Sequence, residues 1–246
     1  MALLEVEQVS VSFGGVQALQ RVDLDVAAGE AAGLIGPNGA GKTTLFNAIC
    51  GLQAIEGGLI RLDGRDIVGV AAHKRARLGI SRTFQRLEVF GSMSVRDNIR
   101  VAADVRRRWA GKDGKVGTPP AERTEELLDR VGLRAVAGER VEALPTGLAR
   151  LVEVGRALAS EPTVLLLDEP SSGLDEDETD GLADLLEELT GEGLAVLLVE
   201  HDVELVMRVC GTVHVLDFGR MIAAGTPTEV QSDPHVQAAY LGTATA

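Results

Sequence analysis

The sequence has little cysteine and no long apolar run, and each shortage excludes a class of protein. Only Cys50 and Cys210 occur among 246 residues. Both lie in apolar stretches, so we expect reduced core residues of a cytosolic protein and no disulfide. No apolar run approaches the ~20 residues that a transmembrane helix needs. Any work at a membrane is therefore expected to pass through a partner.

Basic charge is also scarce. Lys and Arg number 24 against 37 Asp and Glu, and the net charge of −13 argues against a nucleic-acid partner, which would need a basic face. The one basic run, Arg106–Arg108, is interpreted as the solvated end of a helix. The first residues alternate as a strand does, so we expect no signal peptide. A chain of this length buries roughly 70–75% of its unfolded surface, enough for one large core and a small second lobe.

What the sequence does contain is a phosphate-binding loop. Residues 36–43 read Gly-Pro-Asn-Gly-Ala-Gly-Lys-Thr and fit the pattern Gly-x-x-x-x-Gly-Lys-Ser/Thr at each fixed position. A short apolar run at 31–35 precedes the loop, and a segment with helical spacing follows at 44–50. Strand, loop and helix in this order aim backbone N–H groups at a polyphosphate. We expect Lys42 to bridge the β- and γ-phosphates and the Thr43 hydroxyl to ligate Mg²⁺.

The remaining pattern predicts an α/β protein with two kinds of sheet. Alternating segments around the loop predict an antiparallel β subdomain, whereas later continuous apolar runs between helical segments predict βαβ crossovers and a mostly parallel sheet. Expected strands span 3–13, 16–26, 57–67 (a hairpin with an Asp-Gly turn), 79–84, 163–167, 194–199 and 213–217. Expected helices span 71–78, 94–108, 121–131 and 182–189, with short helices in 229–241 and an exposed loop at 110–120.

The mostly helical stretch from 94 to about 160 predicts a lobe inserted into the α/β core. We therefore expect a single domain over 1–246. Its P-loop core, with the β subdomain, is formed by 1–85 and 161–246, and its helical subdomain by about 86–160.

Two acidic residues directly follow the apolar strand at 164–167. The carboxyl end of a parallel strand is where a P-loop fold places its Mg²⁺-side carboxylate. We expect Asp168 to orient Mg²⁺ through its waters and Glu169 to polarise the attacking water. Without the P-loop, the same pair would be interpreted as a solvated strand end.

Three further polar residues are ambiguous by themselves. His201 follows another apolar strand, at the edge where the nucleotide should lie; it either reaches a γ-phosphate or is structural, and both interpretations stay open. Gln85 lies at a strand-to-loop junction and by itself indicates nothing. Asp175, a short turn beyond the carboxylate pair, reads as a helix N-cap or turn residue.

The order and spacing of these motifs resemble the ATP-binding subunit of an ATP-binding-cassette (ABC) transporter over essentially the whole chain. The resemblance implies the substrate ATP with Mg²⁺, a Walker A motif at Gly36–Thr44, and a Walker B motif with its catalytic glutamate at Val164–Glu169. It also implies a D-loop at Ser172–Asp175. The implied ATP-binding residues are Phe13 (stacked on adenine), Gly36, Pro37, Asn38, Gly39, Ala40, Gly41, Lys42, Thr43 and Thr44. The implied catalytic residues are Glu169, His201 (the switch histidine) and Gln85 (the Q-loop glutamine), and the implied metal ligands are Thr43, Gln85 and Asp168.

The signature motif of the family departs from its usual form here. Leu-Ser-Gly-Gly-Gln aligns with Leu144–Leu148, so Pro145 replaces the serine that would bind the partner's γ-phosphate, and Thr146 replaces the first glycine. The partner-facing residues so implied are Pro145, Thr146, Gly147 and Asp175. The importer subgroup tolerates proline here. A hydrogen bond to a charged group contributes about 1.5–3 kcal/mol, so its loss would weaken ATP-driven closure roughly 10–100-fold unless Thr146 or a backbone N–H replaces it.

Within the family, the chain is similar to ATPases of branched-chain amino acid importers, in Gly79–Gln85, Gly219–Pro227 and Ala239–Gly242. Amide, urea and lipopolysaccharide-export ATPases look alike in these stretches. The resemblance implies a second ATPase subunit (identical or a paralogue), membrane permease subunits, an indirect periplasmic or extracellular solute-binding protein, and a place at the cytoplasmic face of the membrane. Other classes to weigh are a soluble ABC protein acting on ribosomes or DNA, which usually carries two cassettes, and a P-loop kinase, which needs no switch histidine.

The segment from Gln85 to Met93 is a candidate docking surface for the permease. Leu87, Val89 and Phe90 place apolar side chains on a loop, where they either form a shallow groove for a permease helix or pack inward between the lobes. The sequence leaves both interpretations open.

Overall fold

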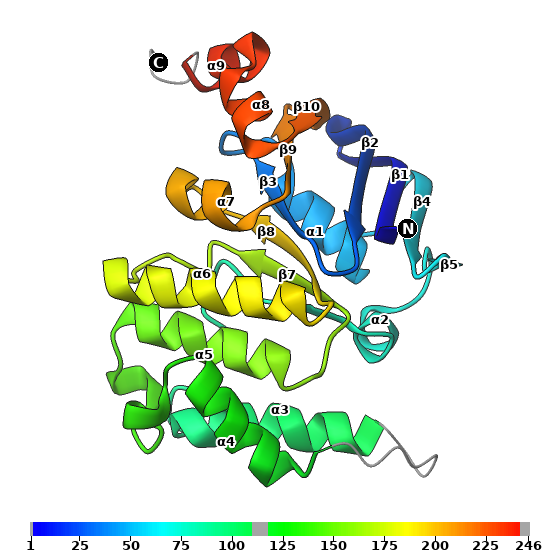
Figure 1. Cartoon of the computed structure of the whole chain (residues 1–246). Helices are drawn as coiled ribbons and strands as arrows, with labels where there is room; N and C mark the ends of the chain where they lie inside the picture. The colour runs from blue at the N-terminus through cyan, green and yellow to red at the C-terminus, as the bar shows by residue number, and fades with distance from the viewer. Residues whose placement is uncertain (1, 110–117, 242–246) are drawn as a thin grey trace.

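The computed structural model describes residues 2–109 and 118–241, and their strands form two sheets (Figure 1). The smaller, antiparallel sheet has the order β2-β1-β4-β5. The larger has the order β10-β9-β3-β8-β7-β6, and its pairs are parallel except β10–β9. The strands are β1 (Ala2–Phe13), β2 (Val16–Ala27), β3 (Ala31–Ile35), β4 (Gly57–Leu62), β5 (Arg65–Asp66), β6 (Ile80–Arg82), β7 (Val164–Asp168), β8 (Ala195–Val199), β9 (Thr212–Asp217) and β10 (Arg220–Gly225).

The helices cover the larger sheet and extend away from it. In Figure 1, α3, α4 and α5 gather at the end of the molecule opposite the smaller sheet, and α6 lies between them and the strands. The helices are α1 (Lys42–Cys50), α2 (Ala72–Arg77), α3 (Val95–Trp109), α4 (Pro120–Arg130), α5 (Thr146–Leu158), α6 (Glu176–Gly191), α7 (Val203–Val209), α8 (Pro227–Ser232) and α9 (Pro234–Leu241). Short 3₁₀ turns occur at Arg134–Val136 and Val141–Ala143.

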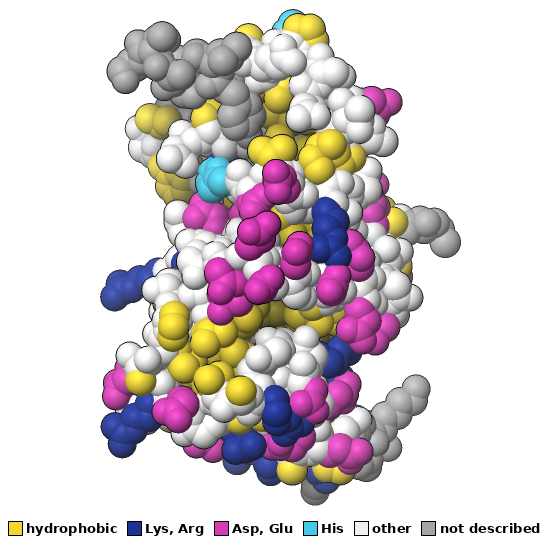
Figure 2. Space-filling model, turned by 60° about the vertical axis from the view of Figure 1, so that its left-hand side comes forward, with side chains coloured by type: hydrophobic (Ala, Val, Ile, Leu, Met, Phe, Trp, Pro, Cys, Tyr) yellow, Lys and Arg dark blue, Asp and Glu magenta, His cyan; other side chains and the backbone are white. Residues whose placement is uncertain are grey.

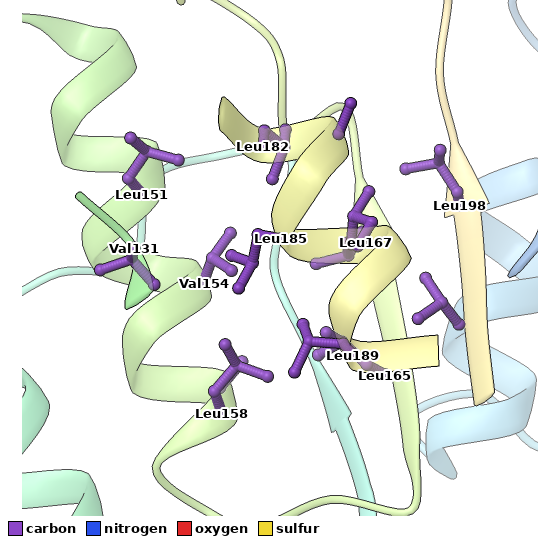
Figure 3. Close-up of a cluster of buried hydrophobic side chains, with 14 of the residues drawn as sticks. Val131, Leu151, Val154, Leu158, Leu165, Leu167, Leu182, Leu185, Leu189 and Leu198 are labelled. Atoms are coloured by element: carbon purple, nitrogen blue, oxygen red, sulfur yellow. The ribbon is translucent and has the colours of Figure 1, made fainter. Parts of the chain in front are cut away.

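The larger sheet separates two hydrophobic cores. Side chains of a strand alternate between its faces, and in β7 Val164 and Leu166 belong to the core shared with α1 and the smaller sheet. Leu165 and Leu167 belong to the opposite core, with α5 and α6 (Figure 3). Because both faces are covered, the strand is apolar from Val164 to Leu167, as expected of a buried parallel strand.

The expected α/β architecture, with an antiparallel sheet beside a mostly parallel one, is confirmed. The expected hairpin is β4 and β5, joined by Asp63 and Gly64 with φ of 50° and 68°. Two consecutive positive φ angles are typical of the tight turn that an Asp-Gly pair favours.

Other parts of the secondary structure differ from the expectation. α6 begins at Glu176, earlier than the expected start near 182. The sequence pattern missed its first turn because that turn is acidic and has no apolar periodicity. Asp175 caps it through a capping box with Glu178, which confirms the N-cap interpretation. The sequence pattern does not predict α7, which has only two turns, or β10, an edge strand without a clear alternation.

Smaller expectations have mixed outcomes. Cys50 and Cys210 are buried and unpaired as expected, and burial together with the charges of Glu30 and Glu200 raises the pKa of Cys210 to about 12. Arg106–Arg108 form the last turn of α3. The loop expected at 110–120 falls mostly outside the described residues. Within 2–109 and 118–241, every helix is too short or too polar to cross a bilayer. Acidic side chains form a band across the middle of the face in Figure 2.

Candidate nucleotide-binding site

Glycines shape the loop between β3 and α1. Gly36 has φ of 151°, and a Cβ there would overlap the carbonyl oxygen of Leu216. Gly41 has φ of 112°, and a Cβ would lie 2.7 Å from the carbonyl oxygen of Ala18. Both positions therefore require glycine. Gly41 is also the N-cap of α1 and has no side chain to cap it, so the first N–H groups of the helix are left available to an anion.

A cavity of about 370 Å³ opens in front of this loop. Its lining combines the loop with four segments that are remote in sequence. The lining residues are Ala18, Asn38, Gly39, Ala40, Gly41, Lys42, Thr43, Thr44, Gln85, Asp168, Glu169 and Val199. The structure thus brings most of the Walker A motif together with the Q-loop glutamine and both Walker B carboxylates.

Lys42 and Asp168 are charged groups held in a partly desolvated place. The Lys42 ammonium donates to the carbonyl oxygens of Gly36 (2.6 Å) and Pro37 (3.1 Å). Burial lowers the pKa of Lys42, against the opposing charges of Glu169 and Asp168. Burial raises the pKa of Asp168, partly offset by Arg82. Because charge interactions strengthen where water is excluded, a polyphosphate would meet a strong local field here.

The donor set in the cavity suits Mg²⁺. Within the described parts of the chain, no three His, Cys, Asp or Glu residues group as a self-contained metal site. The cavity instead offers the Thr43 hydroxyl, the Gln85 amide and the Asp168 carboxylate. These oxygens fit Mg²⁺, which commonly takes one or two protein carboxylates and completes its shell with phosphate and water.

Glu169 and His201 face each other at the ends of neighbouring strands. Glu169 Oε1 lies 3.0 Å from His201 Nε2. Glu169 has φ of 51°, a left-handed conformation that is unfavourable for a side chain of this kind, and its N–H donates to the Val199 carbonyl oxygen at 2.8 Å. Strained residues concentrate at functional sites. His201 is not among the residues that line the cavity, and its side chain is half exposed.

Arg82, which the sequence interpretation did not single out as a site residue, contacts the carboxylate of Asp168. Arg82 lies 3.4 Å from Asp168 Oδ2, donates to Asn47 Oδ1 at 2.7 Å, and stacks its guanidinium 4.4 Å from the Phe84 ring centroid. Thr83 next to it accepts the Asp168 N–H at 3.0 Å. An arginine inside an expected strand was the signal that could have identified this residue, because a charge that is buried there needs a partner.

A row of charged residues on α5 holds the Q-loop, and the sequence interpretation missed it as well. Arg150 donates to the carbonyl oxygens of Phe84 (2.6 Å) and Gln85, and pairs with Glu153 at 3.2 Å. Glu153 accepts the N–H of Glu88 at 2.8 Å. These side chains recur every three residues, so they lie along one face of the helix.

One turn further along α5, Arg156 continues the row. It donates to the Glu88 carbonyl oxygen and lies 4.8 Å from the Phe90 ring centroid. Phe90 is 45% exposed, whereas Leu87 and Val89 are partly buried against the core. The segment therefore divides between the two interpretations: two of its apolar residues pack inward and one faces outward.

The signature residues lie at the N-terminus of α5, away from the cavity lining. Pro145 is the N-cap, and both it and Thr146 are exposed. Gly147 is buried, and a Cβ there would overlap the carbonyl oxygen of Gly173 in the expected D-loop. Phe13, at the end of β1, is 51% exposed and is not part of the lining either.

The comparisons with known proteins agree with this geometry. A family model described as ABC transporter matches residues 19–172, and one described as branched-chain amino acid ATP-binding cassette transporter matches residues 220–246. The high-affinity branched-chain amino acid transport ATP-binding protein BraF of Pseudomonas aeruginosa is 39% identical, with 98% of each chain covered. The lipopolysaccharide export system ATP-binding protein LptB of Escherichia coli is 35% identical over the same share.

Solved structures show the same fold. A nucleotide-free ATP-binding cassette from an ABC transporter has a TM-score of 0.86 at 28% identity, covering 98% of this chain and 99% of that one. The ADP conformation of such a cassette gives 0.85 at 28% identity, with the same coverage. The chain therefore belongs to the ABC transporter family and is an ATP-binding, ATP-hydrolysing cassette, as the sequence motifs indicated.

Proposed function

We propose that this cassette powers import of branched-chain or related amino acids through membrane permease subunits, at the cytoplasmic face of the membrane. The observation that carries the proposal is the match of residues 220–246 to the branched-chain amino acid model. The 39% identity to BraF supports it. LptB at 35% identity keeps lipopolysaccharide export as the second candidate.

In this proposal two cassettes sandwich two ATP molecules, each between one subunit's P-loop and the other's signature helix. Lys42 and the first N–H groups of α1 hold the phosphates. Thr43, Gln85 and Asp168 hold Mg²⁺, which when bound neutralises charge that develops on the phosphates. Glu169 orients and polarises the attacking water. His201, 3.0 Å from that carboxylate, contacts the γ-phosphate and keeps Glu169 in place.

The helical lobe of about 86–160 is proposed to move with the permease. Its link to the site is the Q-loop, held by Arg150 and Glu153 on the same helix that carries the signature. A solute-binding protein outside the membrane is expected to act on the permease and to reach this chain only indirectly.

Uptake in cells tests the proposal. In the organism that carries the gene, deletion should abolish most high-affinity uptake of radiolabelled leucine, isoleucine and valine, and the wild-type gene should restore it. The Glu169→Gln gene should fail to restore uptake, and lysine uptake serves as the control. Normal leucine uptake with reduced lipopolysaccharide at the cell surface would favour the second candidate.

A further inference from the structure

Glu200 is a buried carboxylate without a basic partner among the ion pairs of the described residues. It directly follows β8, is 4% exposed, and precedes His201. A buried charge needs compensation, and here backbone N–H groups supply it. Glu200 Oε1 accepts from Ser171 at 2.8 Å, and Oε2 accepts from His201 at 3.0 Å and, more weakly, from Asp202 at 3.4 Å.

The two oxygens of Glu200 thus bind two different turns. Ser171 lies in the turn that follows Glu169 at the end of β7, and His201 opens the turn that leads into α7. These turns carry the two side chains that meet at 3.0 Å in the site. The Glu200 carboxylate therefore connects the backbone of the turn after Glu169 to the backbone of the turn at His201.

Both members of that pair need such support. Glu169 holds a left-handed φ of 51°, which persists only when its surroundings fix it. The His201 side chain is half exposed, so packing restricts it less than it would a buried side chain. The far end of α7 is anchored separately, because Arg208 pairs with Glu187 at 2.9 Å and with Asp180 at 3.1 Å on α6. Glu200 is the matching anchor at the near end.

We propose that Glu200 is a positioning residue for ATP hydrolysis: its carboxylate locks the turn after Glu169 to the turn at His201 and so sets the geometry of that pair. The inference rests on the roles proposed above for Glu169 and His201. It concerns the chemical step and not nucleotide binding, because Glu200 does not line the cavity that contains the P-loop.

Glu200→Gln tests the proposal in the full-length protein. The amide has the same shape but only one acceptor; however it is turned, its NH₂ group faces the N–H of one of the two turns. A displacement of catalytic groups by about 1 Å can cost on the order of 100-fold in rate. We therefore expect kcat for ATP to fall by about tenfold or more, with KM for ATP and the binding of a fluorescent ATP analogue changed less than about twofold.

Two further variants separate geometry from charge and from folding. Glu204→Gln removes the same charge from an exposed position on α7 and should leave kcat unchanged. Glu200→Asp keeps the charge and both oxygens but is one methylene too short to bind both turns, so it should lose activity like Glu200→Gln. If Glu200→Asp keeps wild-type kcat while Glu200→Gln does not, the charge matters and the bridging role is wrong.

The double variant Glu169→Gln/Glu200→Gln distinguishes failure of the inference from failure of the proposed function. If Glu200 acts through Glu169, the second substitution should lower the residual rate of Glu169→Gln by less than about twofold. A wild-type kcat in Glu200→Gln, or full additivity in the double variant, overturns the inference. Near-normal turnover in Glu169→Gln instead overturns the assignment of Glu169 itself. A lower melting temperature with unchanged kcat would show a structural role only, and would also overturn the inference.

Discussion

The P-loop and the signature end of α5 are both helix N-termini for which we propose a phosphate ligand, yet they are built differently. At the P-loop, Gly41 takes φ of 112° where a side chain does not fit, and Lys42 follows at once. At the signature, the N-cap is an exposed proline, and the one buried residue, Gly147, contacts the D-loop instead of a nucleotide cavity. The first site takes its loop from consecutive residues and the rest of its lining from remote segments, whereas the signature is a helix end that lines no such cavity.

That difference shows which contacts fix the geometry of each site. The P-loop combines positive φ angles at Gly36 and Gly41 with close contacts to Leu216 and Ala18, and its cavity is lined by residues of this one chain. The signature helix is positioned by Gly147 against Gly173 and by Arg150 and Glu153 against the Q-loop. The position of its N-terminus therefore depends on the positions of the D-loop and the Q-loop.

The largest expected effect is at the P-loop. Lys42→Ala removes the one cationic side chain that lines the described cavity, and should weaken ATP binding by more than about 100-fold, since two charge-assisted hydrogen bonds to phosphate are lost. Equilibrium binding of a fluorescent ATP analogue measures this. Lys74→Ala, on the exposed face of α2, is the control. Unchanged affinity in Lys42→Ala would show that the loop does not bind the polyphosphate as proposed.

The next effect separates chemistry from binding. Glu169→Gln should retain ATP affinity and reduce kcat by about 10²–10³-fold, because an amide cannot accept a proton from water. The variant should also remain dimeric for longer in ATP, which sedimentation velocity detects. Glu122→Gln, exposed on α4, should behave as wild type. Near-normal turnover would place the general base elsewhere.

A smaller effect is expected from crowding the signature. Gly147→Ala introduces a Cβ that overlaps the Gly173 carbonyl oxygen, and overpacking of this kind costs about 1–3 kcal/mol. We expect ATP-dependent dimerisation and hydrolysis to fall about tenfold while nucleotide affinity of the monomer is kept. Gly138→Ala is the control, because a Cβ there meets nothing within 4 Å. Equal loss of monomer affinity in Gly147→Ala would mean that the two sites are not separable.

Coupling to the membrane should respond to Phe90, the exposed apolar residue of the candidate docking segment Gln85–Met93. Phe90→Asp places a charge where an apolar ring is 45% exposed beside Arg156. With purified permease in vesicles, the stimulation of hydrolysis should fall several-fold, whereas ATP binding by the isolated chain should be unchanged. Phe218→Asp, at a position 81% exposed in the turn before β10, is the control. Unfolding of the Phe90 variant would indicate that the ring belongs to the core.

The same comparison explains what the sequence predicts well. The P-loop, the parallel strands and the carboxylates at 168–169 follow from local patterns whose physical causes are local: glycine conformations, apolar runs and strand ends. The sequence does not identify three charged site residues, because their partners are remote in sequence. Arg82 pairs with Asp168, Glu153 accepts the N–H of Glu88, and Glu200 accepts the N–H of Ser171. A buried charge in an apolar segment is the signal that would have found them, since it requires a partner somewhere.

The last expected effect concerns the altered signature residue. Pro145 is the N-cap of α5 and provides no side-chain cap. Serine is among the best N-cap residues and could use its hydroxyl either to cap α5 or to reach the partner's γ-phosphate. Capping would raise the melting temperature, in part offset by the greater freedom of the unfolded chain once proline is lost. Reaching the phosphate would strengthen ATP-dependent dimerisation, which we expect to rise by up to about tenfold in Pro145→Ser, from a wild type that is mainly monomeric without ATP and weakly active alone.

Pro145→Ala is the matched control, because it also removes the ring and adds no hydroxyl. Sedimentation equilibrium with and without ATP, together with thermal unfolding, separates the two uses of the serine. If Ser and Ala dimerise equally while only Ser raises the melting temperature, the hydroxyl caps its own helix and does not reach the nucleotide. If Pro145→Ser also dimerises no more strongly than the wild type, Thr146 or a backbone N–H of the first turn already replaces the missing hydroxyl.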